Sequence, residues 1–166
     1  MSGLIRIATA ECFTHGKIAR EIHAFSQGYP LSYKWTINPK NYKLSLIAGL
    51  FIPTISGIKK ILKFEPLPPT EVIDDIKVYD ETADKKMAKK MAMAIKDITG
   101  ADVGIGTTAG VGRGGIAVIS DEIEAIGSSD VYADLRSSPA TEIMKRQQSG
   151  VEKALKLLED TLPSII

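Results

Sequence analysis

The chain contains a single cysteine, Cys12, and the residues around it are of types that could support nucleophilic chemistry. A predicted strand gives way to a predicted helix here, and a thiol at the start of a helix feels the positive end of the macrodipole, which favours the thiolate. His15 is a candidate base or ion-pair partner for the sulfur, and Glu11 is a candidate for orienting a substrate amine or hydroxyl. The segment therefore predicts a catalytic group of Cys12, His15 and Glu11, although a lone cysteine is more often a buried structural residue.

A second candidate site is the segment 104–115, in which six of twelve residues are glycine. Its backbone N–H groups could turn toward an anion, Thr107 and Thr108 add hydroxyl donors, and Arg113 adds a fork that fits phosphate. A Rossmann loop would open a helix and a Walker loop would carry Gly-Lys before Ser or Thr, and this segment does neither. A plain glycine-rich hairpin and a phosphate site both remain open, and the two threonines with Arg113 favour phosphate. The predicted ligand-binding residues are Thr9, Thr14, Gly106, Thr107, Thr108, Ala109, Gly110, Gly112, Arg113 and Gly114.

The elements that must position these residues alternate between strand and helix patterns. Apolar stripes at helical spacing predict helices over residues 17–25, 57–64, 80–98 and 142–162, with Thr14 as an N-cap and Gly28 as a stop for the first. Apolar runs predict strands over 4–10, 44–53, 103–106, 116–120 and 131–135, and residues 29–42 read as an irregular excursion.

This alternation indicates an α/β fold with three layers, α/β/α, around a mixed or mostly parallel sheet. The length fits one domain over residues 1–166. In such sheets ligands bind at the carboxyl ends of the strands. Cys12 follows the first strand and Thr107 follows the strand 103–106, so both segments are expected at one edge.

The composition narrows the classes of partner and compartment. With 21 basic and 20 acidic residues the net charge is +1, which argues against a nucleic-acid or membrane-surface protein. A single cysteine favours a reducing compartment, and with no secretory signal in view we expect a cytoplasmic protein. The apolar segment 44–58 is too short and interrupted to span a membrane. The two histidines and Cys12 fit no standard zinc spacing, so no metal site is expected. Methionine-rich and apolar helix faces make a homodimer possible.

The residues Thr9-Ala10-Glu11, Cys12, Thr14 and Gly16 resemble the Thr-Ala-Glu-Ser-Cys-Thr-Gly-Gly signature of CinA-type C-terminal domains, the nicotinamide mononucleotide deamidase fold. Segments 47–62, 81–109 and 131–162 resemble later parts of that fold in the same order. Cys12 and Phe13 stand where the deamidases carry Ser and Cys, and His15 replaces their first glycine. A thiol in an alkoxide position would give longer-lived acyl adducts.

A closer resemblance lies in residues 8–18, Ala-Thr-Ala-Glu-Cys-Phe-Thr-His-Gly-Lys-Ile, which are similar to the start of the HcgF family of methanogenic archaea. That family assembles the iron-guanylylpyridinol cofactor of the mononuclear iron hydrogenase. The resemblance implies guanylylpyridinol as the ligand, which has a carboxymethyl arm on its pyridinol ring and a guanylyl phosphate. It further implies an E1-like, ThiF-type partner that adenylylates the carboxylate, and transfer of the acyl group to Cys12 as a thioester.

Two other functions remain open at this stage. The first is an amidohydrolase of the deamidase type acting on a pyridine nucleotide. The second is a non-catalytic nucleotide-binding protein. Incubation with candidate ligands separates the three, since they predict a covalent mass increase on Cys12, ammonia release, or binding with neither.

Overall fold

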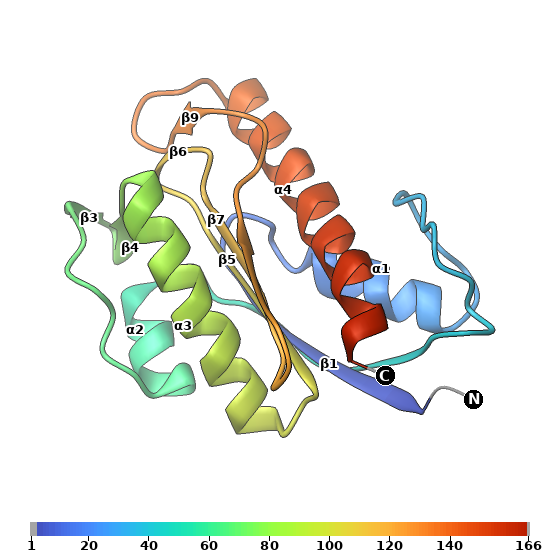
Figure 1. Ribbon diagram of the computed structural model, residues 1–166. Helices are drawn as coiled ribbons and strands as arrows, with labels where there is room; N and C mark the ends of the chain where they lie inside the picture. Colours follow the sequence, from blue (N-terminus) through green and yellow to red (C-terminus); the bar gives the residue numbers. More distant parts are fainter. Residues whose placement is uncertain (1–2, 166) are drawn as a thin grey trace.

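A five-stranded mixed sheet lies at the centre of the computed structural model, which describes residues 3–165 (Figure 1). The strand order is β2-β1-β5-β7-β8. The two strand pairs at the β2 end of the sheet are parallel, β1 with β2 and β1 with β5, whereas β7 runs antiparallel to both β5 and β8. The prediction of a mixed sheet is therefore confirmed. The strands are β1 (Leu4–Glu11), β2 (Lys43–Phe51), β5 (Val103–Thr108), β7 (Gly115–Ile119) and β8 (Glu124–Gly127).

Helices cover both faces of this sheet, so the predicted three-layer α/β/α architecture is confirmed. Helix α3 (Glu81–Thr99) lies on one face, together with α2 (Ile55–Gly57) and the π-helical turn Ile58–Leu62. Helices α1 (Lys17–Ser26) and α4 (Ala140–Thr161) lie on the other, and a short 3-10 turn, Leu162–Ser164, follows α4.

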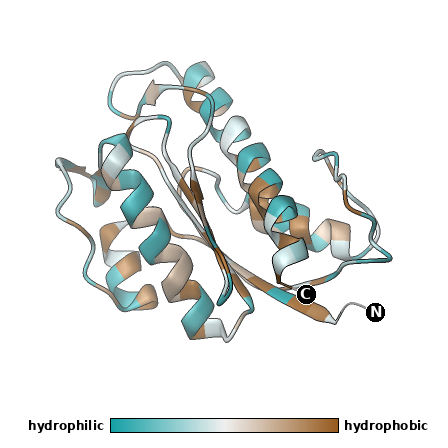
Figure 2. Ribbon diagram, in the orientation of Figure 1, coloured by the Kyte–Doolittle hydropathy of each residue, from teal (hydrophilic) through white to brown (hydrophobic). Residues whose placement is uncertain are grey.

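The alternation of side chains along β1 divides the interior into two apolar layers. Ile5 and Ile7 pack toward α1 and α4, whereas Ala8 and Ala10 pack toward α3. Figure 2 shows apolar residues gathered along the sheet, and polar and apolar residues mixed along α3 and α4, as expected for helices with one buried face. Small residues on the α3 side of β1 leave room for the methionines of α3, which fill that layer.

The predicted boundaries differ from the structure mainly in short elements. The predicted strand 131–135 reduces to β9 (Ala133–Asp134), which pairs with β6 (Val111–Gly112) outside the main sheet. The hairpin of β3 (Glu71–Ile73) and β4 (Ile76–Val78) was not predicted, nor was β8. Strand β2 is an edge strand of exposed and partly buried residues in which only Leu44 is fully buried, and not the fully buried strand expected from its apolar sequence.

The first helix shows how the chain turns after β1. Thr14 is not its N-cap, because α1 begins at Lys17 after a left-handed Gly16 with φ of 78°. Gly28 has φ of 85° beyond the last turn, as expected for a glycine that stops a helix. Among residues 3–165, no helix combines the length and the apolarity needed to cross a bilayer.

The segment 29–42 is irregular, as predicted, and hydrogen bonds to the carboxylate of Glu159 hold it against α4. Glu159 of α4 accepts hydrogen bonds from the Tyr33 hydroxyl and from the backbone N–H groups of Thr36 and Ile37. Trp35 packs on Phe25 of α1, with ring centroids 4.3 Å apart. The aromatic residues of the excursion therefore serve in packing it onto α1 and α4.

Candidate functional site

Cys12 lies immediately after β1, at the carboxyl edge of the sheet, and is hydrogen-bonded to β5. Its backbone N–H donates to the carbonyl oxygen of Thr107 at 2.9 Å and to the Thr107 hydroxyl at 3.2 Å. The same hydroxyl lies 2.8 Å from that of Thr14. The structure thus brings the two candidate segments together at one edge, as the parallel pairing of their strands requires.

A cavity of about 180 Å³ opens beside Cys12, a residue that is 9% exposed. Most of its wall is apolar or aromatic, and it is built from the segment after β1, the end of β2 and the helix α4. The basic residues among those that line it are His15 and Arg146. The full set of lining residues is Cys12, Phe13, His15, Phe51, Pro53, Ile76, Ala109, Leu135, Ile143 and Arg146.

Glu11 is fully buried and does not line this cavity. Its carboxylate accepts hydrogen bonds from the hydroxyls of Thr9 and Thr14, at 2.8 and 2.6 Å. It also accepts from the backbone N–H groups of Ile18 and Ala19 in the first turn of α1, at 3.1 and 3.0 Å. Burial raises the pKa of Glu11, and these hydrogen bonds oppose that effect.

The geometry therefore gives Glu11, Thr9 and Thr14 a positioning role, and not the substrate contacts expected from the sequence. The positive end of the α1 macrodipole, expected to favour a thiolate at Cys12, faces Glu11 instead. The N–H groups at the start of α1 point at the Glu11 carboxylate, so they are not available to a thiolate at Cys12.

His15 sits beside Cys12 in a left-handed conformation, with φ of 54°. Its backbone N–H donates to the Cys12 carbonyl at 3.2 Å, and its ring stacks on Phe51 with centroids 4.5 Å apart. Burial, with the nearby charge of Lys17, lowers the pKa of His15. The neutral imidazole, which is able to accept a proton, is therefore favoured near neutral pH.

The glycine-rich segment forms a hairpin in which several of the N–H groups offered for an anion already have partners. The N–H of Gly110 donates to Asp84 Oδ2 at 2.9 Å, and that of Arg113 donates to Glu81 Oε1 at 2.8 Å. Thr108 is buried, and only Ala109 of this segment lines the cavity. The carboxylates of Asp84 and Glu81 therefore use two N–H groups that the sequence offered for binding an anion.

Several of these glycines are explained by close packing against α3. A Cβ at Gly104 or Gly106 would lie 2.1 Å from the Ala92 carbonyl oxygen or 2.2 Å from that of Ala88. Glycine at these positions allows α3 to lie directly on β5. The geometry therefore favours the plain hairpin, one of the two interpretations that the sequence left open. Of the side chains expected to bind phosphate in this segment, that of Arg113 is exposed to solvent.

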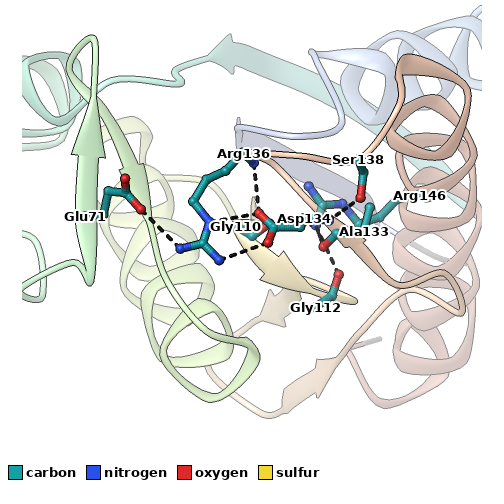
Figure 3. A network of polar contacts seen from close by, with 8 residues as sticks. All are labelled: Glu71, Gly110, Gly112, Ala133, Asp134, Arg136, Ser138 and Arg146. Carbon is teal, nitrogen blue, oxygen red and sulfur yellow. Dashed lines mark hydrogen bonds and ion pairs between the residues drawn. The ribbon is translucent and has the colours of Figure 1, made fainter.

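Arg146 of α4 is a site residue that sequence reasoning missed. The residue is 1% exposed, and its Nη1 donates to the carbonyl oxygens of Gly110, Gly112 and Ala133 at 2.9, 3.0 and 2.8 Å (Figure 3). Its guanidinium carbon lies 5.9 Å from the centroid of the Phe13 ring. One signal was present in the sequence, because Arg146 lies three residues after Ile143 and therefore shares the buried face of α4.

Two further ionisable residues, Asp84 and Lys77, are buried, and Asp84 contacts the hairpin through Gly110. Burial raises the pKa of Asp84 to about 7, although its hydrogen bond from Gly110 and the charge of Lys77 act against that shift. Within residues 3–165, Asp84 Oδ1 and Lys77 Nζ are buried without a hydrogen-bond partner. In the same part of the chain no group of three or more His, Cys, Asp or Glu side chains is arranged to hold a metal ion.

The fold is similar to that of solved CinA superfamily proteins. A Klebsiella pneumoniae member of that superfamily matches with a TM-score of 0.57 and 15% identity, over 96% of this chain and 88% of the other. An Escherichia coli member matches with a TM-score of 0.52 and 20% identity, over 93% and 80%. At these identities the likeness concerns the fold alone, and it agrees with the predicted CinA-like architecture.

The sequence relatives are proteins of methanogens. A UPF0254 protein of Methanothermobacter thermautotrophicus is 57% identical over 96% of this chain and 99% of its own length. Another from Methanopyrus kandleri is 46% identical over 92% and 85%. The family model described as FeGP cofactor biosynthesis protein HcgF matches residues 4–162. The chain therefore belongs to the HcgF family of FeGP cofactor biosynthesis proteins.

Proposed function

We propose that Cys12 accepts the activated carboxylate of guanylylpyridinol as a thioester during FeGP cofactor biosynthesis. Family membership supports the pathway. The observation that carries the role of Cys12 is its position, since the only thiol of the chain lines a cavity at the carboxyl edge of the sheet. That edge is where α/β proteins of this kind bind their ligands.

The reaction requires an activated acyl donor, because a free carboxylate would have to expel oxide. We propose that an E1-like, ThiF-type partner supplies an acyl-adenylate. The Cys12 sulfur attacks the acyl carbon, a carbon–sulfur bond forms, and the bond from that carbon to the phosphate oxygen breaks. AMP leaves with the electron pair, and the thiol proton passes to the neutral His15 imidazole or to water.

The size of the cavity indicates which part of the ligand it receives. At about 180 Å³ it is smaller than the roughly 300–1,000 Å³ typical of sites for whole drug-sized ligands. It suits a ring with a short carboxyl arm, and the guanylyl part would then extend outside it. His15, Phe51 and Phe13 offer aromatic surface for the ring. A reducing compartment such as the cytoplasm would keep the thiol free.

An amidohydrolase remains the second candidate, because the fold is shared with the CinA superfamily and His15 stands beside the nucleophile. Such an enzyme would release ammonia from a pyridine nucleotide amide and leave no lasting adduct. The two functions differ in the lifetime of the acyl-enzyme, which mass spectrometry measures directly.

The test is the intact mass of the protein after incubation with guanylylpyridinol, ATP and the adenylylating partner. We expect a mass increase confined to the Cys12 peptide and removed by neutral hydroxylamine, as thioesters are. Cys12→Ala should give no adduct, and Cys12→Ser should give none or a hydroxylamine-resistant ester. Absence of any adduct in the wild-type protein, with ammonia released from a nucleotide amide, would favour the amidohydrolase.

A further inference from the structure

The guanidinium of Arg146 has one edge in use and one edge free. Its hydrogen bonds to Gly110, Gly112 and Ala133 all run from Nη1, as Figure 3 shows. In the described part of the chain Nε is buried without an acceptor, and the hydrogen bonds of the guanidinium run from Nη1. A buried donor without an acceptor is rare in native proteins, so an unpaired one indicates a missing partner.

The free edge has the geometry of a carboxylate receptor. An arginine presents Nε–H and one Nη2–H side by side, and this pair binds the two oxygens of a carboxylate through parallel hydrogen bonds. The bonds from Nη1 hold the plane of the group, so little side-chain entropy would be lost when an anion binds. A lysine at this place would offer a point charge without the fork.

Arg146 lies in the wall of the cavity that Cys12 also lines. Arg146 and Cys12 line the same cavity, and Arg146 is the only lysine or arginine among its lining residues. Burial lowers the pKa of Arg146, while the nearby charge of Asp84 acts in the opposite direction. The guanidinium still remains charged at physiological pH.

Phe13 contacts both the guanidinium of Arg146 and the helix that carries it. Its ring packs on α4 at Gly150, where an added Cβ would lie 2.4 Å from a ring carbon. Gly150 is one helical turn beyond Arg146, so the residue that follows Cys12 in sequence is wedged against the helix that carries the guanidinium. The packing therefore couples the Cys12 segment to Arg146.

We infer that the free edge of Arg146, Nε and Nη2, is the carboxyl-binding subsite of the Cys12 cavity. The inference rests on the proposed function, because it names the group that would hold the carboxyl beside the sulfur. In the acyl-adenylate the same edge would meet the acyl oxygen, on which negative charge develops as the sulfur attacks.

The alkylation of Cys12 by two small probes tests this subsite without guanylylpyridinol or a partner. Iodoacetate carries a carboxylate and iodoacetamide carries a neutral amide. The rate constant for iodoacetate divided by that for iodoacetamide therefore reports an anion-binding group beside the sulfur. We expect this ratio for the native protein to exceed that of glutathione, at the same pH and ionic strength, by roughly tenfold, or about 1.4 kcal/mol. 2-Pyridylacetate should slow the iodoacetamide reaction, whereas 2-pyridylacetamide should not.

Variants then assign the effect to one side chain. Arg146→Met should bring the ratio to that of glutathione, and Arg146→Lys should keep only part of the preference. The matched control is Arg136→Met, since Arg136 is exposed and already paired with Asp134 and Glu71, and it should retain the native ratio. Should Arg146→Met fail to fold, the wild-type ratio and the pyridylacetate competition still decide the question.

The outcomes separate this subsite from the proposed function. A wild-type ratio no greater than that of glutathione, or an unchanged ratio in folded Arg146→Met, overturns the subsite even if the thioester forms. A raised ratio that depends on Arg146, measured on protein that forms no thioester, establishes the subsite and rejects the proposed acyl transfer.

Discussion

The Glu11 carboxylate at the end of β1 accepts a hydrogen bond from the backbone N–H of Ala19 in α1, with 3.0 Å between oxygen and nitrogen. This bond spans the segment that carries Cys12 and His15. Together with the bond from Ile18, it fixes the start of α1 against the end of β1. The conformation of the segment that carries Cys12 and His15 is therefore set by a carboxylate that faces the interior.

Replacing Glu11 by Gln tests this positioning role. The amide keeps one oxygen acceptor but places an NH₂ group opposite a hydroxyl or backbone N–H, so one buried donor loses its partner. We expect a loss of about 1–3 kcal/mol in the free energy of unfolding, measured by urea denaturation. Glu152→Gln is a suitable control, since Glu152 is exposed on α4 and its loss should change stability little. Equal stability of Glu11→Gln and the wild-type protein would contradict the role.

Asp84 predicts a pH dependence of stability. Its pKa is raised by burial from 3.8 to about 7, so the folded protein holds a proton that the unfolded chain releases. Stability from this group is fully present below pH 3.8 and is lost as the pH rises through about 7. We expect the wild-type protein to lose about 2–4 kcal/mol of unfolding free energy across this window through Asp84.

Asp84→Asn isolates that effect, because the amide resembles the protonated acid in shape and cannot ionise. The difference in unfolding free energy between variant and wild type should shift in favour of the variant from pH 4 to pH 8. Asp97→Asn on the exposed face of the same helix is the control and should show no such trend. A wild-type stability that rises over this interval in parallel with Asp84→Asn would rule out the proposed titration.

The glycines of β5 predict a packing defect when they are substituted. A Cβ at Gly106 would lie 2.2 Å from the Ala88 carbonyl oxygen, so Gly106→Ala must push α3 away from the sheet. We expect a destabilisation of about 1–3 kcal/mol in urea denaturation. Gly3→Ala, where no atom lies within 4 Å of the added Cβ, should be nearly neutral. Unchanged stability of Gly106→Ala would remove the packing explanation for this glycine.

Much of the fold could be predicted from periodicity. Apolar periodicity predicted three helices and one strand within a few residues of their observed bounds, namely α1, α3, α4 and β1. The rule for parallel strands also predicted that Cys12 and Thr107 meet at one edge. Strands of two to four residues, such as β8 and β9, were missed or misplaced because so short a run carries little pattern of its own.

The details of the site depended on contacts that local sequence does not contain. The glycines of segment 104–115 suggest an anion site, but packing against α3 explains Gly104 and Gly106, and Asp84 accepts from the Gly110 N–H. The spacing from Ile143 places Arg146 on the buried face of a helix, but only the tertiary fold shows that it lines the same cavity as Cys12. Residues distant in sequence therefore determine the chemistry of the cavity.

His15 predicts a specific effect on the rate of acyl transfer. Its imidazole lines the cavity with Cys12, and burial lowers its pKa, so the neutral form able to accept the thiol proton predominates near pH 7. His15→Gln should slow single-turnover thioester formation at pH 7 by about tenfold or more, since general bases contribute roughly 10²–10⁴-fold in favourable cases. The rate is measured from the intact mass of samples quenched at successive times.

The pH profile distinguishes a base from a merely structural histidine. In the wild-type protein the rate should fall as His15 becomes protonated, with a midpoint below 6.5, the ordinary value for histidine. That limb should be absent from His15→Gln. His23→Gln supplies the matched control, because His23 is the only other histidine and lies exposed on α1. If His15→Gln and His23→Gln both follow the wild-type profile, the thiol proton passes directly to water and His15 serves only to stack on Phe51.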